Sequence, residues 1–302
     1  MQVKRIKRPI NGVLLLDKPH GFSSNQALQK AKWLLQAAKA GHTGTLDPLA
    51  TGLLPLCFGE ATKFAHYLTD ADKTYIATMK LGITTNTGDA EGEILETLPV
   101  NISSVQFREA ISAFVGEIMQ VPPMYSALKH EGKALYEYAR AGVEIERKAR
   151  AVHIYAIELN SFDQDVAEIT VRCSKGTYIR TLAEDIGRSL DCGAHLIGLR
   201  RTATANYHIS QSISLEAFEA MTADQRIAAL LPADSAVENF PAVMLNDDSA
   251  YYVRQGQAVW QSGVKQTGFI RLYTAQQQFI GLGEMQPDGK IAPKRLIVQA
   301  PE

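Results

Sequence analysis

The stretch GHTGTLDPLATGLLPL, residues 41–56, decides how this chain is interpreted. It combines three glycines, three threonines and a single acid, Asp47, with apolar residues directly behind that acid. An Asp-Pro pair in a Gly/Thr-rich segment is typical of a turn or of a helix N-cap. A carboxylate beside an apolar run could also serve chemistry, because desolvation changes the reactivity of an acid. The rest of the chain has to separate these two interpretations.

The composition predicts a globular protein with enough apolar material for a core. Of 302 residues, 46% are hydrophobic and 21% are charged, which is ordinary for folded domains. No run of about 18 apolar residues exists, so no membrane span is expected. The three cysteines are widely spaced and form no C-x-x-C pair. They predict neither a zinc ribbon nor a disulfide framework, and reduced cysteines indicate a cytoplasmic location.

Positive charge is concentrated near the N-terminus although the formal net charge is only −1. Residues 1–50 hold eight Lys or Arg against Asp17 and Asp47. A basic region of this kind can attract phosphates on a neutral protein, although a solvated basic tail gives the same pattern.

The segments around Asp47 predict a strand, a helix and then a loop. GVLLLD at 12–17 is typical of a short buried strand, and Lys18-Pro19-His20-Gly21 ends it in a turn. Ser23 and Gln26 form a possible capping box. Apolar residues then recur at helical spacing, which predicts a helix to Lys39. We therefore expect residues 41–56 to be a loop between this helix and the next apolar segment.

Further along, the patterns alternate between strands and helices. KTYIATMKLGI at 73–83 and AEITVRC at 167–173 predict strands, and a helix is expected from Thr177 to Leu190 with Arg180 in its first turn. Residues 122–142 interleave cations with tyrosines, a pattern suited to RNA contact and also to an ordinary amphipathic helix. Beyond a linker bracketed by Pro232 and Pro241, short strands predict a small β domain.

Several chemistries do not fit Asp47. The stretch lacks the lysine of a P-loop, and no G-x-G-x-x-G follows a strand. His42 and Asp47 are too few ligands for a metal site, so no metal is expected. A glycosidase needs two carboxylates. A lone aspartate acting as a nucleophile needs only ionisation, desolvation and a positive partner.

The stretch resembles the signature of the TruB-type tRNA pseudouridine synthases, and the similarity extends over nearly the whole chain. GVLLLDKPHGFSS resembles the opening segment of that family, and KTYIATMKLGITTNTGDAEGE resembles its second motif. PPMYSALKHEGKALYEYARAG is similar to its insertion and CSKGTYIRTLAEDIG to its third motif. AHLIGLRRTATANY follows in the same order, and FIGLGEMQPDGKIAPKRLI resembles a small PUA-like domain.

The resemblance implies a role for six residues. Asp47 falls on the catalytic aspartate, and the other five fall on residues of the substrate site. Tyr75 corresponds to a tyrosine that stacks on the target uracil, Arg180 to the partner of the aspartate, and Leu199 to an apolar residue beside the site. His42 corresponds to a histidine linked to opening the T loop, and Lys18 to a first-motif residue that supports the site.

The resemblance also implies an architecture. We expect an α+β pseudouridine synthase fold, with a central mixed, largely antiparallel sheet flanked by helices. Residues 1–240 would form the catalytic domain, with an RNA-binding insertion at about 122–150, and residues 241–302 a PUA-like RNA-binding domain. A monomer is the default.

The implied activity is isomerisation of uridine to pseudouridine at position 55 in the T loop of tRNA. The base must be flipped out of its stack and held against an aromatic or apolar wall. No redox change occurs and no group is added, so no cofactor is chemically required. Asp47 could attack C1′, add to C6 or act as a base at C2′, and the sequence leaves these routes open. The alternatives are a tRNA-binding folding chaperone without catalysis and a small-molecule enzyme such as a nucleoside hydrolase.

Overall fold

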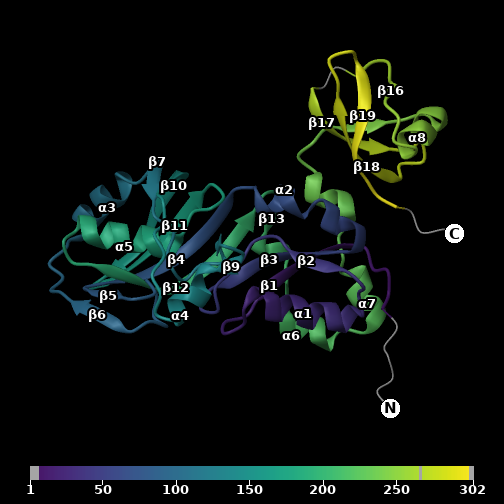
Figure 1. Cartoon of the computed structure of the whole chain (residues 1–302). Helices are drawn as coiled ribbons and strands as arrows, with labels where there is room; N and C mark the ends of the chain where they lie inside the picture. Colours follow the sequence, from purple (N-terminus) through teal and green to yellow (C-terminus); the bar gives the residue numbers. More distant parts are fainter. Residues whose placement is uncertain (1–6, 265–266, 299–302) are drawn as a thin grey trace.

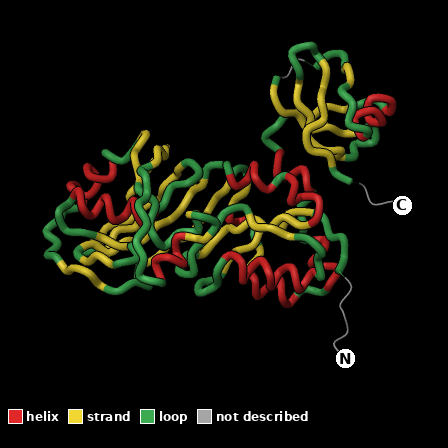
Figure 2. Tube along the Cα trace, viewed as in Figure 1, coloured by secondary structure: helices red, strands yellow, loops and turns green. Residues whose placement is uncertain are grey.

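A large mixed sheet forms the framework of the molecule (Figures 1 and 2). The computed structural model of the chain describes residues 7–264 and 267–298. Within these residues the sheet has ten strands, eight of which follow one another in space. Their order is β14 (Ile213–Ser214), β1 (Gly12–Lys18), β3 (Thr51–Phe58), β12 (Ala194–Thr204), β4 (Lys73–Leu81), β11 (Val166–Cys173), β10 (Arg150–Asp163) and β7 (Gly116–Gln120). The short strands β2 (Ala40–His42) and β13 (Tyr207–His208) pair with β3 and β12.

Most neighbouring strands of this sheet are antiparallel, and two pairs are parallel. β1 pairs with β14 and β3 pairs with β12 in parallel registers, whereas β4, β10 and β11 form an antiparallel set. The expected α+β class with a mixed, largely antiparallel sheet is therefore confirmed.

Helices cover one face of the sheet and enclose the main core. Alternate residues of β1 and β4, such as Leu14, Leu16, Ala77 and Met79, point into this core. Helices with apolar faces at helical spacing close it from outside. They are α1 (Ser24–Leu35), α3 (Ser104–Ser112), α5 (Ile179–Ser189), α6 (Leu215–Ala220) and α7 (Ala223–Ala228).

The opposite face of the β1–β3 half carries a second core that reaches the C-terminal domain. Val13 and Leu15, which alternate with the residues of the main core, pack with Phe64 and with Leu282 of the C-terminal sheet. The elements between them are the 3₁₀ helices η1 (Gly59–Lys63) and η3 (Ala233–Val237) and the helix α2 (Ala65–Thr69).

The C-terminal domain is a small curled sheet with one helix (Figure 1). In the described part of residues 241–302, five strands lie in the order β15 (Ala242–Met244), β17 (Gly268–Tyr273), β18 (Phe279–Met285), β19 (Lys290–Leu296) and β16 (Val259–Trp260). The helix α8 (Asp247–Arg254) packs on this sheet around Val253.

Two short hairpins complete the fold. One joins β5 (Ile83–Thr85) to β6 (Ile94–Thr97), directly after β4. The other, β8 (Lys129–His130) with β9 (Lys133–Ala134), leads into α4 (Leu135–Arg140) inside the expected insertion. Residues 122–142 are therefore mostly irregular, with a helix of only six residues.

Three local expectations were wrong. The first helix ends at Leu35 instead of Lys39, because Gln36 adopts a left-handed conformation at its C-cap. Residues 41–56 are not one loop, since β2 ends at His42 and β3 begins at Thr51. The segment between Pro232 and Pro241 contains η3, whose Ala236 and Val237 are buried, so it is packed structure and not a free linker.

Candidate active site

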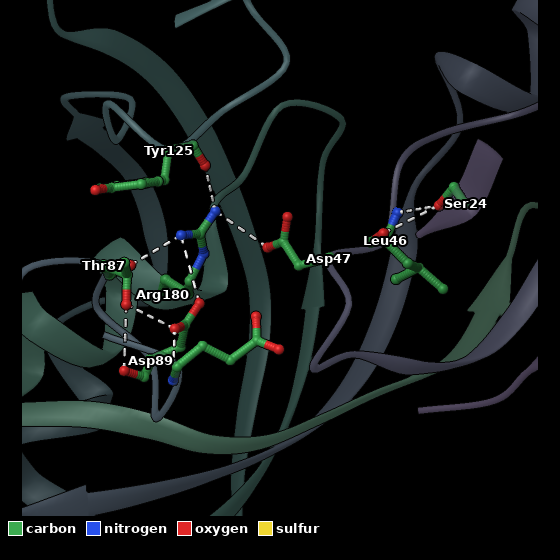
Figure 3. Close-up of polar contacts among 8 residues, drawn as sticks. Ser24, Leu46, Asp47, Thr87, Asp89, Tyr125 and Arg180 are labelled. Carbon is green, nitrogen blue, oxygen red and sulfur yellow. Dashed lines mark hydrogen bonds and ion pairs between the residues drawn. The ribbon is translucent and has the colours of Figure 1, made fainter. Parts of the chain in front are cut away.

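Asp47 lies in a short loop, residues 43–50, that is held from two sides. Ser24, the first residue of α1, donates from Oγ to the Leu46 carbonyl (3.0 Å) and accepts from the Leu46 amide (2.7 Å) (Figure 3). The buried Thr43 donates to the Pro55 carbonyl (3.2 Å). The turn itself is closed by a bond from the Ala50 amide to the Asp47 carbonyl. These bonds fix the direction in which the Asp47 side chain leaves the loop.

Arg180 meets Asp47 from the first turn of α5. Its Nη2 lies 3.1 Å from Asp47 Oδ2 (Figure 3). The same guanidinium donates to the carbonyls of Thr87 (2.8 Å) and Tyr125 (2.6 Å). Only 7% of the Arg180 side chain is exposed, and a cation gains nothing from the positive end of a helix. Its position is accounted for by the carboxylates and carbonyls that it faces.

A second carboxylate, Asp89, lies on the other side of the same guanidinium. Its Oδ2 is 3.5 Å from Arg180 Nη1, and its side chain is only 5% exposed. Thr87 Oγ1 (2.7 Å) and the Glu91 amide (3.1 Å) both donate to Asp89 Oδ1. One buried cation is thus shared by two acids.

The electrostatics of Asp47 reflect this sharing. Burial raises the pKa of Asp47 above its ordinary value, and the charge of Asp89 adds to the rise. Arg180 opposes it most strongly, followed by Lys18. The side chain keeps 37% of its surface accessible, so the carboxylate faces a pocket and is not sealed in the core.

That pocket has a volume of about 450 Å³ and brings five of the six predicted residues together. His42, Asp47, Tyr75, Arg180 and Leu199 all line it. Tyr75 and Leu199 project from the adjacent strands β4 and β12 and form an apolar wall. The partly apolar lining around a single carboxylate suits a site that limits the access of water to a reactive intermediate once substrate fills it.

Lys18, the sixth predicted residue, does not line this pocket. It is fully buried, and its Nζ donates to the carbonyls of Pro19 (2.9 Å) and Phe22 (2.5 Å). Burial lowers its pKa to about 8, although Asp47 and Glu91 oppose the fall. These buried backbone contacts fit a role for Lys18 in supporting the site, and they do not fit a contact between Lys18 and the substrate.

His42 lines the pocket in a partly buried position. Burial lowers its pKa, and the nearby charge of Arg201 lowers it further. Its Nδ1 is buried and makes no hydrogen bond with any described residue.

Sequence reasoning missed three residues of the site. Asp89 stood within the second motif, KTYIATMKLGITTNTGDAEGE, without a role. Tyr178 and Arg201 line the pocket and were quoted within motifs without a role. The one available signal for Arg201 was its spacing, because Leu199 and Arg201 must point to the same side of a strand.

Within residues 7–264 and 267–298 no three His, Cys, Asp or Glu side chains converge as a metal site would require. The described helices include none that is long and apolar enough to cross a membrane.

The fold of this chain also occurs in known proteins. Among solved structures, a chain of a Cbf5-Nop10-Gar1 complex superposes with a TM-score of 0.73 at 27% identity, covering 94% of this chain and 84% of that one. Family models match three consecutive parts of the sequence. They are "TruB family pseudouridylate synthase (N terminal domain)" at 32–179, "tRNA pseudouridylate synthase B C-terminal domain" at 180–238 and "Pseudouridine synthase II TruB, C-terminal" at 241–297.

Bacterial relatives are similar to this chain over its full length or nearly so. A protein of Methylobacillus flagellatus named tRNA pseudouridine synthase B is 60% identical over all 302 residues, which is 100% of both chains. Proteins of the same name from Neisseria meningitidis (56% identity; 95% of this chain, 94% of the relative) and Pseudomonas aeruginosa (53%; 98% and 99%) are also similar. The chain belongs to the TruB family of pseudouridine synthases.

Proposed function

We propose that this protein converts uridine to pseudouridine in the T loop of tRNA, at position 55. The observation that carries the proposal is the Asp47–Arg180 pair at the wall of a pocket lined by Tyr75 and Leu199. Relatives at 53–60% identity over nearly the whole chain bear the name tRNA pseudouridine synthase B, which supports tRNA as the substrate.

The reaction is an isomerisation within one nucleotide. The C1′–N1 bond breaks, the uracil turns without leaving, a C1′–C5 bond forms, and C5 loses its proton while N1 gains one. Tyr75 offers a ring face for the flipped base, a contact worth about 1–3 kcal/mol in stacking of bases on aromatic side chains. Leu199 closes the wall beside it, and the enclosure keeps the detached base in place.

Asp47 must be ionised in each of the three possible routes, whether it attacks C1′, adds to C6 or removes the C2′ proton. Arg180 serves this need by opposing the rise in the pKa of Asp47 that burial causes. In the same position it contacts one oxygen of the carboxylate, and no dashed line reaches the other oxygen (Figure 3).

The insertion supplies features suited to RNA at the rim of the pocket. Ser126, Ala127 and Leu128 line the pocket itself. Further along, the Lys133 ammonium lies 4.8 Å from the Tyr138 ring centre, and the Arg140 guanidinium 5.4 Å from that of Tyr136. Exposed cations next to rings can contact phosphates and stack on bases, so we assign RNA binding to residues 122–150 and, by family likeness, to 241–302.

Three buried, unpaired thiols, those of Cys57, Cys173 and Cys192, suit a reducing compartment. On this basis we place the protein in the cytoplasm.

Release of tritium tests the activity directly. Unmodified tRNA labelled with tritium at C5 of uridine should lose label to water when the wild-type protein acts on it. The Asp47→Asn variant should bind the same tRNA and release no label, because an amide cannot replace the ionised carboxylate. Binding without release by the wild type would instead favour a chaperone. Substantial turnover by Asp47→Asn would refute the assignment of the residue.

The salt dependence of binding tests the substrate class. Phosphate contacts release counterions, so the affinity for tRNA should fall steeply as salt rises. An enzyme acting on free uridine would bind its substrate with little dependence on salt. A flat dependence for tRNA, measured by filter binding, would therefore favour the nucleoside hydrolase.

A further inference from the structure

Arg201 is a buried cation that the reaction as described so far does not use. Only 1% of it is exposed, and it is among the largest fully buried side chains of the protein. It forms no ion pair with any carboxylate in the described ranges. Burying a charge without an opposite charge is costly, so its place in the pocket lining calls for a reason.

The backbone is arranged to bring this side chain to the pocket. Arg201 lies directly opposite Tyr75 where β12 pairs with β4, so both side chains leave the same face. The register of the two strands shifts between Arg201 and Ala203, and such bulges re-aim side chains near active sites. On the other flank β12 approaches β3 so closely that a Cβ on Gly52 would lie 2.3 Å from the Arg201 carbonyl oxygen.

The guanidinium connects three elements of the site. Its Nε donates to the Leu53 carbonyl of β3 (2.7 Å), and its Nη2 donates to the Gly44 carbonyl of the catalytic loop (3.3 Å). Tyr75, directly opposite Arg201 on β4, lines the same pocket. Burial raises the pKa of the Tyr75 hydroxyl, and the charge and polar contact of the adjacent Arg201 guanidinium oppose the rise. The loop that carries Asp47 and the tyrosine that faces the base are thus joined through one planar, rigid group.

We propose that Arg201 is a positioning residue that sets the Tyr75 ring relative to the Asp47 loop. The proposal rests on the function proposed above. Arg201 acts through the tyrosine hydroxyl at one end and the Gly44 carbonyl at the other, and it fixes the distance between the stacked base and the carboxylate. A planar fork can hold both ends at once, whereas a lysine in its place cannot.

This role predicts a particular division of kinetic effects. A misplaced reacting group slows chemistry by about 100-fold even when binding persists. Arg201→Lys should therefore lower the single-turnover rate of tritium release by about 100-fold, while the Kd for tRNA stays close to that of the wild type. Arg200→Lys is the matched control, since the neighbouring Arg200 pairs with Asp17 (2.6 Å) and does not line the pocket. Its rate should be unchanged.

A double-mutant cycle with Tyr75→Phe then separates positioning from general support of the fold. The phenylalanine keeps the ring face and removes only the hydroxyl that Arg201 contacts. If Arg201 acts through this hydroxyl, Arg201→Lys should lower the single-turnover rate of tritium release by a clearly smaller factor in the Tyr75→Phe background than in the wild type. Melting temperatures of all variants, and circular dichroism, show whether each is folded.

Two results would overturn the proposal. One is an Arg201→Lys protein that turns over as fast as the wild type. The other is a double variant whose loss of rate equals the product of the losses in the two single variants. That result would mean that Arg201 does not act through Tyr75. An error in the proposed function would look different, because the wild-type protein itself would then release no tritium.

Discussion

At the scale of single residues, the site depends on one guanidinium shared between two carboxylates. Arg180 is held by the Thr87 and Tyr125 carbonyls, so it is in place before any substrate arrives. A preorganised charge of this kind costs no rearrangement at the moment of reaction. The pair is therefore suited to keeping Asp47 ionised, because Arg180 opposes the rise in the pKa of Asp47 that burial causes.

The pH dependence of Arg180→Gln follows from this arrangement. Arg180 is the largest of the groups that lower the pKa of Asp47, so its loss should raise that pKa further. Since the reaction needs the ionised acid, activity is lost as pH falls through the pKa of Asp47. The acidic limb of the rate profile should move to higher pH, with a loss of about 100-fold or more at neutral pH.

Single-turnover tritium release over a range of pH measures this shift. Arg188→Gln is the control, because Arg188 lies at the exposed end of the same helix and pairs with Asp185. An acidic limb that stays in place in Arg180→Gln would mean that Arg180 does not control the ionisation of Asp47.

At the scale of elements, the catalytic loop depends on the start of α1. Ser24 Oγ both donates to and accepts from the backbone of Leu46, the residue before Asp47. The preceding Ser23 caps the same helix with the usual reciprocal bonds to Gln26. Two adjacent serines therefore have different tasks, one on the loop and one on the helix.

Substituting each serine by alanine separates these tasks. Ser24→Ala leaves the buried Leu46 amide unpaired, which should cost about 1–3 kcal/mol of stability and reduce turnover by freeing the Asp47 loop. Ser23→Ala should cost about 1 kcal/mol through loss of the cap and leave the turnover of folded protein unchanged. Thermal unfolding and single-turnover rates test both, and equal rates in the two variants would contradict the anchoring role of Ser24.

At the scale of the whole molecule, the two sheets are joined by a shared apolar core. Leu282 of β18 packs in the cluster that contains Val13 and Leu53 of the large sheet. The rings of Phe64 and Phe279 meet at 5.5 Å across this junction, and the Tyr273 hydroxyl donates to Asp234 (2.7 Å). The C-terminal domain is thus attached by packing as well as by the chain.

Truncating Leu282 tests this attachment. Leu282→Ala should lower stability by about 2–5 kcal/mol, as expected for a cavity in a packed core, and loosen the C-terminal domain. Met244→Ala is the control, because Met244 is 44% exposed on the same domain and should have little effect. Calorimetry measures both, and an unchanged melting temperature in Leu282→Ala would show that the junction adds nothing to stability.

The sequence alone determined much of this protein. A short apolar run predicted β1, and alternation or helical spacing predicted β4, β11 and α5, because these are local patterns. Ordered motifs around Asp47, Tyr75 and Arg180 indicated the family and the site. The ends of the elements were predicted less well, because they depend on distant partners. The Gln36 carbonyl, at the end of α1, accepts from the Arg8 amide, and β2 forms by pairing with β3.

Only the tertiary structure decided which groups surround the catalytic acid. Asp89 reaches Arg180 from a Gly-rich loop more than 90 residues earlier in the chain, at 3.5 Å. Arg201 reaches Tyr75 because β12 lies between β3 and β4 with a bulge at that point. Such contacts follow from strand order and register, which no local pattern specifies. A residue's type and spacing define what it can do, and the packing of distant segments decides what it faces.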